Sequence, residues 1–253
     1  MRAKFLPRVL GTVLAFLFTT ALVSPAAEPL WPEWRAPLIF KFAKELKEAD
    51  TAVAREPNSK QEYSQRGNLL FFLARYPDAI ADFEKMIALD PSEDAPHWRL
   101  GIAYYFVGEY ARAARQFEKY DAYDGHLDRE NGIWRFLAQV HTDGLEKARA
   151  GMLVYKEFDR EPFPALYEMF AGRITPDDLV AEIEQKGFAD HPQVGFFGFF
   201  YVGLDEEVLG HKAHAIELLK RAVDIMPNPN TVYMWNVARL EWERLVTEAA
   251  AAH

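Results

Sequence analysis

Residues 61–91 have the sequence QEYSQRGNLLFFLARYPDAIADFEKMIALDP, and residues 95–125 have the sequence APHWRLGIAYYFVGEYARAARQFEKYDAYDG. The two stretches share a pattern with a period of 34 residues, in which glycine is followed by alanine and then by phenylalanine. The matching positions are Gly67 and Gly101, Ala79 and Ala113, and Phe83 and Phe117. Glycine inside a helix costs about 1 kcal/mol relative to alanine. Its recurrence in register therefore indicates a packing requirement, where a neighbouring helix comes too close for a side chain.

A 34-residue period with these residue types is typical of the tetratricopeptide repeat (TPR), a pair of antiparallel helices. We therefore predict an all-α fold, a TPR-type helix-turn-helix solenoid over residues 38–250. Two repeats are expected at about 60–93 and 94–127, and the chain between them and the next repeat is degenerate. We predict a further repeat at about 196–229, which carries Gly203, Ala215 and Ala222. A degenerate helix is expected at Leu145–Phe158. A C-terminal capping helix, with its charges facing outward, is expected at about Thr231–Ala250.

The N-terminus has the pattern of a secretory signal peptide. A basic segment precedes the apolar stretch Val9–Val23, and small residues follow it. We predict a signal peptide over residues 1–27, with an uncleaved anchor as the alternative. Residues 28–37 are too rich in proline for a helix and form a predicted Pro/Trp-rich arm. Its Trp31 and Trp34 are expected to cover either the protein's own core or a second subunit.

Composition limits the partners and the chemistry. The formal net charge is −9, which argues against nucleic acid and anionic lipid headgroups as partners. The chain has no cysteine, so it has no thiolate metal site or cysteine nucleophile. The acidic residues of 121–131 do not alternate as a calcium loop requires. We therefore expect no metal and no cofactor.

No catalytic motif is present, and we predict that the protein is not an enzyme. His211 and His214 are three positions apart and fit two surface histidines better than a metal site, because no third ligand is evident. The charge run Asp205–Glu207 is expected to be a solvated edge.

The first helices of successive TPRs line a concave face, and this placement predicts a partner-binding groove. Its predicted residues are Ser64, Asn68, Phe71, Trp98, Ile102 and Tyr105. The aromatic members favour an apolar groove for an extended or helical segment of another protein. Asn68 and Arg99 match part of the carboxylate-binding pattern of some TPR domains, but a serine at 64 replaces its lysine. A second possibility stays open, in which these aromatics pack against later helices of the same chain.

The stretches 133–138, 170–174 and 200–223 resemble the NlpI family of periplasmic TPR lipoproteins. The resemblance covers about residues 40–250. It implies a dimeric adaptor of the bacterial envelope that holds proteases and cell-wall hydrolases. The chain departs from that family because it lacks the lipidated cysteine.

These observations favour an exported TPR adaptor, periplasmic or secreted, that binds other envelope proteins and is a possible homodimer. Contact with the membrane is expected only through an uncleaved signal segment. The alternative is a structural subunit of a larger envelope or secretion assembly.

Overall fold

The computed structural model describes residues 31–156, 159–186, 191–226 and 233–252. Over these residues the chain is all-helical, with twelve α-helices, one short 3-10 helix and no strand. The predicted all-α class is therefore confirmed. The predicted signal peptide, residues 1–27, lies outside the described residues.

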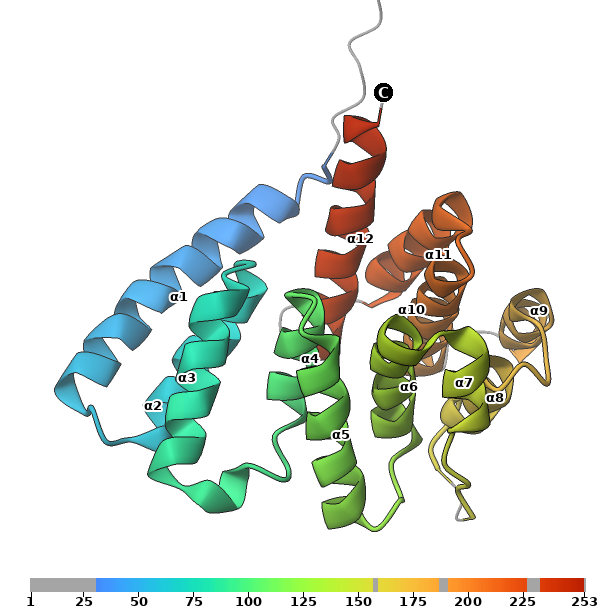
Figure 1. Cartoon of the computed structure of the whole chain (residues 1–253). Coiled ribbons are helices and arrows are strands. Elements are labelled where there is room, and N and C mark those ends of the chain that lie inside the picture. Colours follow the sequence, from blue (N-terminus) through green and yellow to red (C-terminus); the bar gives the residue numbers. More distant parts are fainter. Residues whose placement is uncertain (1–30, 157–158, 187–190, 227–232, 253) are drawn as a thin grey trace, which may run out of the picture.

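The helices form a sequential array (Figure 1) in which each packs against the next, except that α8 packs back on α6 past the short α7. Their bounds are α1 Arg35–Arg55, α2 Lys60–Phe72, α3 Tyr76–Leu89, the 3-10 helix η1 Pro91–Glu93, α4 Trp98–Phe106, α5 Tyr110–Asp124, α6 Arg129–Asp143, α7 Leu145–Ala150, α8 Phe163–Phe170, α9 Pro176–Lys186, α10 Pro192–Val208, α11 Lys212–Ile225 and α12 Tyr233–Ala251.

The repeated glycines face large side chains of the following helix. A Cβ atom on Gly67 would lie 2.6 Å from Cε1 of Phe83, and one on Gly101 would lie 2.7 Å from Cζ of Phe117. In the pair α10–α11, a Cβ on Gly203 would lie 2.9 Å from Cγ of Leu219. The repeat alanines that line the same crossings, Ala79, Ala113, Ala215 and Ala222, are fully buried. The close approach expected at the glycines is therefore present.

The third helix pair is incomplete. The helix predicted to extend from Leu145 to Phe158 is wrong in length, because α7 ends at Ala150 and Gly151 follows it. Residues 152–156 are not helical, and Tyr155 lies against Gly132 of α6. A tyrosine from an irregular segment thus takes the position that Phe83 and Phe117 take from a helix.

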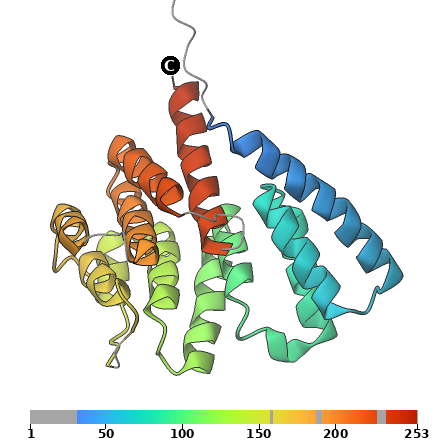
Figure 2. The ribbon, with the colours of Figure 1, turned by 180° about the vertical axis from the view of Figure 1, so that it is seen from behind.

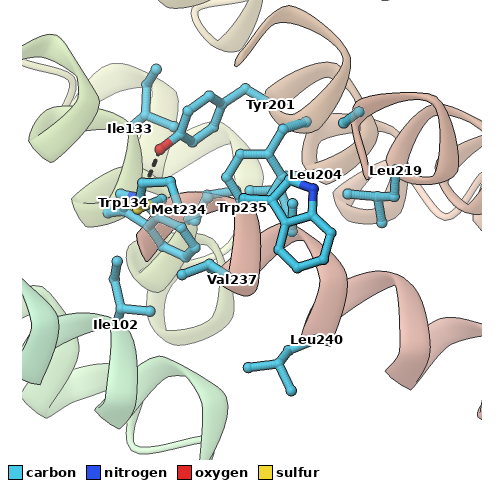
Figure 3. Close-up of a cluster of buried hydrophobic side chains, with 14 of the residues drawn as sticks. Ile102, Ile133, Trp134, Tyr201, Leu204, Leu219, Met234, Trp235, Val237 and Leu240 are labelled. Carbon is cyan, nitrogen blue, oxygen red and sulfur yellow. Dashed lines mark hydrogen bonds between the residues drawn. The ribbon is translucent and has the colours of Figure 1, made fainter. Parts of the chain in front are cut away.

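The C-terminal helix is not an outward-facing cap. In Figures 1 and 2, α12 lies between the α1–α3 end of the array and the α10–α11 pair. Residues 234–243 are all buried, so no polar outer face exists over this stretch. Figure 3 shows Met234, Trp235 and Val237 of α12 inside a cluster with residues of α4, α6, α10 and α11. The expected capping role is therefore corrected to that of a central helix.

The predicted arm is only partly non-helical. Helix α1 begins at Arg35, and Pro37 fits its first turn because the missing N–H has no helical partner there. The rings of Trp31 and Trp242 are 5.7 Å apart, and those of Trp34 and Trp235 are 5.4 Å apart. Of the two expectations for Trp31 and Trp34, the structure has the one in which they cover the protein's own core.

Candidate functional site

The predicted groove residues lie on the inner face of the array, which α12 covers. Phe71 is 0% exposed, and its ring stacks on Tyr233 of α12 at 5.5 Å. Trp98 meets the same tyrosine edge-on at 5.0 Å, and Ile102 is 1% exposed. Packing against a later helix of the same chain is therefore the arrangement found at Phe71 and Trp98. Helix α12 therefore covers the predicted groove at Phe71 and Trp98.

Tyr105 also faces inward, but it packs within the array. Its ring contacts Tyr110 of α5 at 5.3 Å and Trp134 of α6 at 5.5 Å. Its hydroxyl lies 3.4 Å from Nε2 of His141. Tyr105 therefore joins α4 to α5 and α6.

The two polar groove residues hold an arginine. Arg99 donates to Oδ1 of Asn68 at 2.8 Å and to Oγ of Ser64 at 3.1 Å. Burial lowers the pKa of Arg99. A hollow of about 200 Å³ adjoins this cluster, with Lys60 and Glu93 also on its wall. Lys60 is already paired with Asp90 and Glu93, at 2.5 and 2.6 Å.

One part of the inner face is left open beside the first turn of α12. It is a cavity of about 190 Å³, which we call the acidic–aromatic pocket. The lining residues come from α4, α5, α6 with its preceding loop, and α12: Trp98, Ile102, Phe117, Tyr120, Asp128, Glu130, Asn131, Trp134 and Met234. The pocket thus contains two of the six predicted groove residues, Trp98 and Ile102.

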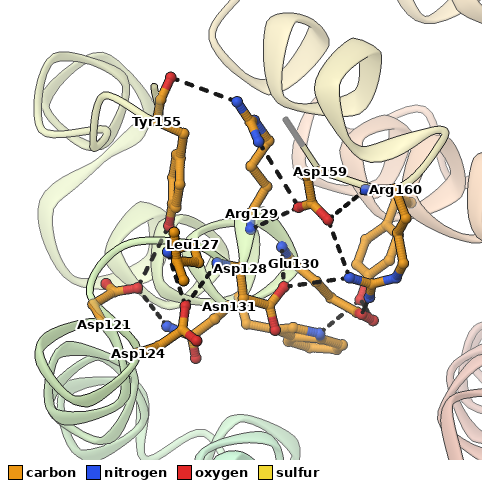
Figure 4. Close-up of polar contacts among 12 residues, drawn as sticks. Asp121, Asp124, Leu127, Asp128, Arg129, Glu130, Asn131, Tyr155, Asp159 and Arg160 are labelled. Carbon is orange, nitrogen blue, oxygen red and sulfur yellow. Dashed lines mark hydrogen bonds and ion pairs between the residues drawn. The ribbon is translucent and has the colours of Figure 1, made fainter. Parts of the chain in front are cut away.

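The turn before α6 positions the acidic residues Asp124, Asp128 and Glu130 (Figure 4). Gly125 has a φ of 75°, a conformation that ends α5 at little cost for glycine. Asp124 then accepts hydrogen bonds from the backbone N–H groups of Leu127 and Asp128, both at 2.8 Å. The carboxylate of Asp128 caps α6 by accepting from the N–H of Glu130 at 3.0 Å.

Burial disfavours the charged form of the carboxylates at this site. It raises the pKa of Glu130 to about 7, although hydrogen bonding from Tyr201 at 2.5 Å and the charge of Arg160 act in the opposite direction. Burial also raises the pKa values of Asp128 and Asp121. Four carboxylates pair with three guanidinium groups here: Asp121 with Arg135, Asp159 with Arg129 and Arg160, and both Asp128 and Glu130 with Arg160. Figure 4 shows the contacts of Arg129 and Arg160.

Asn131 supplies a neutral acceptor at the pocket. Its amide nitrogen donates to the carbonyl of Phe117 at 3.1 Å and to Oδ1 of Asp121 at 2.6 Å. Because both partners are acceptors, the amide atom that contacts them must be the nitrogen, and the other amide atom is the oxygen. That oxygen is buried and has no hydrogen-bond partner within the described part of the chain. Buried polar atoms are normally paired, which makes this one a candidate ligand contact.

A second polar cluster involves the histidines. Oε2 of Glu206 lies 3.0 Å from Nδ1 of both His211 and His214. Asp205 and Glu206 are buried, so the expected solvated edge is wrong at these two positions. No group of three or more possible metal ligands occurs among residues 31–156, 159–186, 191–226 and 233–252.

Sequence reasoning missed most of the pocket. Asp128, Glu130 and Asn131 belong to the polar connection that was set aside for lacking a calcium pattern. Trp134 belongs to the degenerate middle of the chain, where the 34-residue period is lost and does not predict which residues face inward. The available signal was an aspartate at 128 in the N-cap position, followed by Arg129, Glu130 and Asn131, with Trp134 about one turn after Asn131.

Comparison with known proteins gives no relative from which a function can be transferred. No family model matches the sequence, and no curated protein matches it. None of the described helices combines the length and apolarity needed to cross a membrane.

Proposed function

We propose that the protein is an exported TPR-type adaptor, comparable in role to the NlpI family, that holds a segment of another envelope protein on its inner face. The TPR assignment is supported by glycines that each oppose a large residue sixteen positions later: Gly67 and Phe83, Gly101 and Phe117, and Gly203 and Leu219. Glycine against a bulky side chain from the partner helix is the packing that a repeated helix pair needs.

The observation that carries the binding role is the acidic–aromatic pocket. Helix α12 takes up most of the inner face, yet it leaves this cavity of about 190 Å³ at its first turn. The pocket combines tryptophan and tyrosine with buried polar groups. Binding sites in proteins typically combine an apolar wall with a few placed polar groups, and aromatic residues often carry the binding energy.

The test is site-specific photocrosslinking in the envelope of the source cell. A photoreactive phenylalanine replaces Tyr120, which lines the pocket, or Tyr123, a control one turn along the same helix that is 66% exposed. We expect crosslinked partners at position 120 that are not captured from position 123. Cell-wall hydrolases or processing proteases among them would support the adaptor.

Two other outcomes would change the conclusion. Equal capture from both positions would contradict binding at the pocket. One fixed set of structural proteins, recovered in constant ratio from position 120, would favour the alternative of a structural subunit in a larger assembly.

A further inference from the structure

The acidic–aromatic pocket has the wall that an organic cation needs. Trp98, Tyr120 and Trp134 line it, from α4, α5 and α6 respectively. The face of an aromatic ring carries partial negative charge and attracts ammonium and guanidinium groups. Burial raises the pKa of Tyr120 to about 12, and the charges of Asp128, Asp124 and Glu130 act in the same direction. The tyrosine ring therefore lies in a region of negative potential.

Several hydrogen-bond acceptors line the pocket. Asp128 and Glu130 contribute carboxylates, and Asn131 contributes an amide oxygen. Asn131 is 4% exposed, and its nitrogen donates to Asp121 and to the carbonyl of Phe117. Its oxygen is buried and has no hydrogen-bond partner among the described residues. An acceptor buried in this way requires a donor from a ligand or from water.

The surrounding charges favour a cationic donor. Four carboxylates of this cluster, Asp121, Asp128, Glu130 and Asp159, pair with the guanidinium groups of Arg129, Arg135 and Arg160. A fifth carboxylate, that of Asp124, accepts hydrogen bonds from backbone N–H groups. Arg160 shows how a guanidinium group is accommodated beside the pocket. It pairs with Glu130, lies 3.7 Å from Oδ1 of Asp128 and 3.3 Å from Oδ1 of Asp159, and is 4.1 Å from the ring centre of Phe163. Carboxylate and aromatic contacts together hold this arginine.

We propose that the acidic–aromatic pocket binds the guanidinium or ammonium group of an arginine or lysine side chain in a client protein. The ring faces of Trp98 and Trp134 hold the cation, Asp128 pairs with its charge, and Asn131 accepts one of its N–H groups. Only the source of this side chain, a client segment, rests on the proposed adaptor function. The affinity for the cation itself depends on the pocket alone.

The experiment uses the full chain and two peptides of equal shape. Acetyl-Gly-Arg-Gly-amide carries the cation, and its citrulline counterpart replaces the guanidinium with a neutral urea group. Binding is followed by NMR through the indole N–H signals of the tryptophans. We expect saturable shifts with the arginine peptide and none with the citrulline peptide. A third peptide with lysine tests whether an ammonium group is accepted as well.

Two matched variants test the role of the carboxylate. Asp128→Asn removes one charge from the pocket but keeps an N-cap residue of similar strength. Asp124→Asn removes the same charge from the neighbouring turn, outside the pocket wall. We expect Asp128→Asn to weaken arginine-peptide binding about tenfold, as for the loss of one charge-assisted hydrogen bond, and Asp124→Asn to change it little.

Each outcome decides the proposal. Equal shifts with arginine and citrulline, no binding of either peptide, or equal losses in both variants would overturn the cation site. Selective binding of arginine that depends on Asp128 would support it, even if crosslinking at Tyr120 captured no partner. In that case the adaptor function would fail while the cation site stood.

Discussion

At the scale of single residues, the repeat depends on close contacts between glycine and a ring. A Cβ on Gly67 or Gly101 would meet the phenylalanine of the next helix well inside van der Waals distance. Fully buried alanines lie beside both crossings. Interiors are packed to crystal-like density, so even one methyl group is felt there. The same contact recurs at Gly132, but with a tyrosine from outside a helix.

The variant Gly101→Ala should destabilise the protein although alanine is the better helix former. Overpacking against Phe117 costs about 1–3 kcal/mol, which exceeds the gain of about 1 kcal/mol in helix propensity. Phe117→Leu should make room, so that Gly101→Ala costs less in that background. Urea denaturation of the four proteins of this double-mutant cycle measures the coupling. Additive costs would show that the glycine is not there to accommodate the ring.

At the scale of elements, helix α10 differs from an ordinary surface helix. It packs against α8, α9 and α11, and eleven of its residues are buried. The dense phenylalanine run at its start is shared among these neighbours. Its C-terminal half also carries Asp205, which is 1% exposed and has one carboxylate oxygen without a hydrogen-bond partner among the described residues. Burial without a full set of hydrogen-bond partners disfavours the ionised form of this carboxylate.

Stability should therefore depend on pH through Asp205. Burial raises its pKa from 3.8 to about 6, so the folded state holds the proton more tightly than the unfolded state. The contribution of Asp205 to the free energy of unfolding is therefore largest below pH 3.8. It is lost as the pH rises to about 6. The difference corresponds to about 3 kcal/mol.

The variant Asp205→Asn tests this dependence. It should be more stable than the parent protein at pH 8 and nearly equal to it at pH 4, as measured by urea denaturation across this range. Glu217→Gln, on an exposed position of α11, serves as a control that removes a carboxylate without this effect. Parallel stability curves for Asp205→Asn and the parent protein would contradict the assigned cause.

At the scale of the whole molecule, α12 joins the two ends of the array. Arg35 of α1 makes two hydrogen bonds to Glu243, at 2.9 and 3.1 Å. Arg239 donates to the same carboxylate at 3.1 Å and to the carbonyl of Phe72 in α2 at 2.6 Å. On the other side, Arg244 pairs with Glu207 of α10. The helix thereby connects the first repeats to the last one.

Removing one partner of this network should be costly. Arg239 is 0% exposed, and Arg239→Met leaves the carbonyl of Phe72 and part of Glu243 without their donor. We expect a loss of about 3 kcal/mol in unfolding free energy, as for other broken buried ion pairs. The double variant Arg239→Met with Glu243→Met should recover part of this loss, since both members of this buried ion pair are then removed.

Arg115→Met, on the exposed face of α5, is the matched control. Denaturation monitored by circular dichroism measures all four proteins. A cost for Arg239→Met no larger than that of the control would show that α12 does not depend on this network.

The sequence by itself determined the local structure of this protein. The all-α class, most helix positions and the glycine contacts follow from periodicity, turn residues and helix propensity, which act over a few neighbouring residues. Thr175, for example, directly precedes α9, and its hydroxyl accepts the N–H of Asp178 at 3.1 Å, as is typical of a threonine at a helix N-cap. These interactions are short-range, so the residue pattern is sufficient to predict them.

Only the tertiary structure decided the placement of α12 and the extent of the pocket. Helix α12 is buried on every side between residues 234 and 243. Its mixture of aromatic and charged residues does not indicate which other helices cover it. The pocket wall combines a predicted residue, Trp98, with Asp128, Asn131 and Trp134 from the segment where the repeat is lost. Contacts between residues distant in sequence depend on how complete helices pack, because their free energy comes from buried area that no local pattern records.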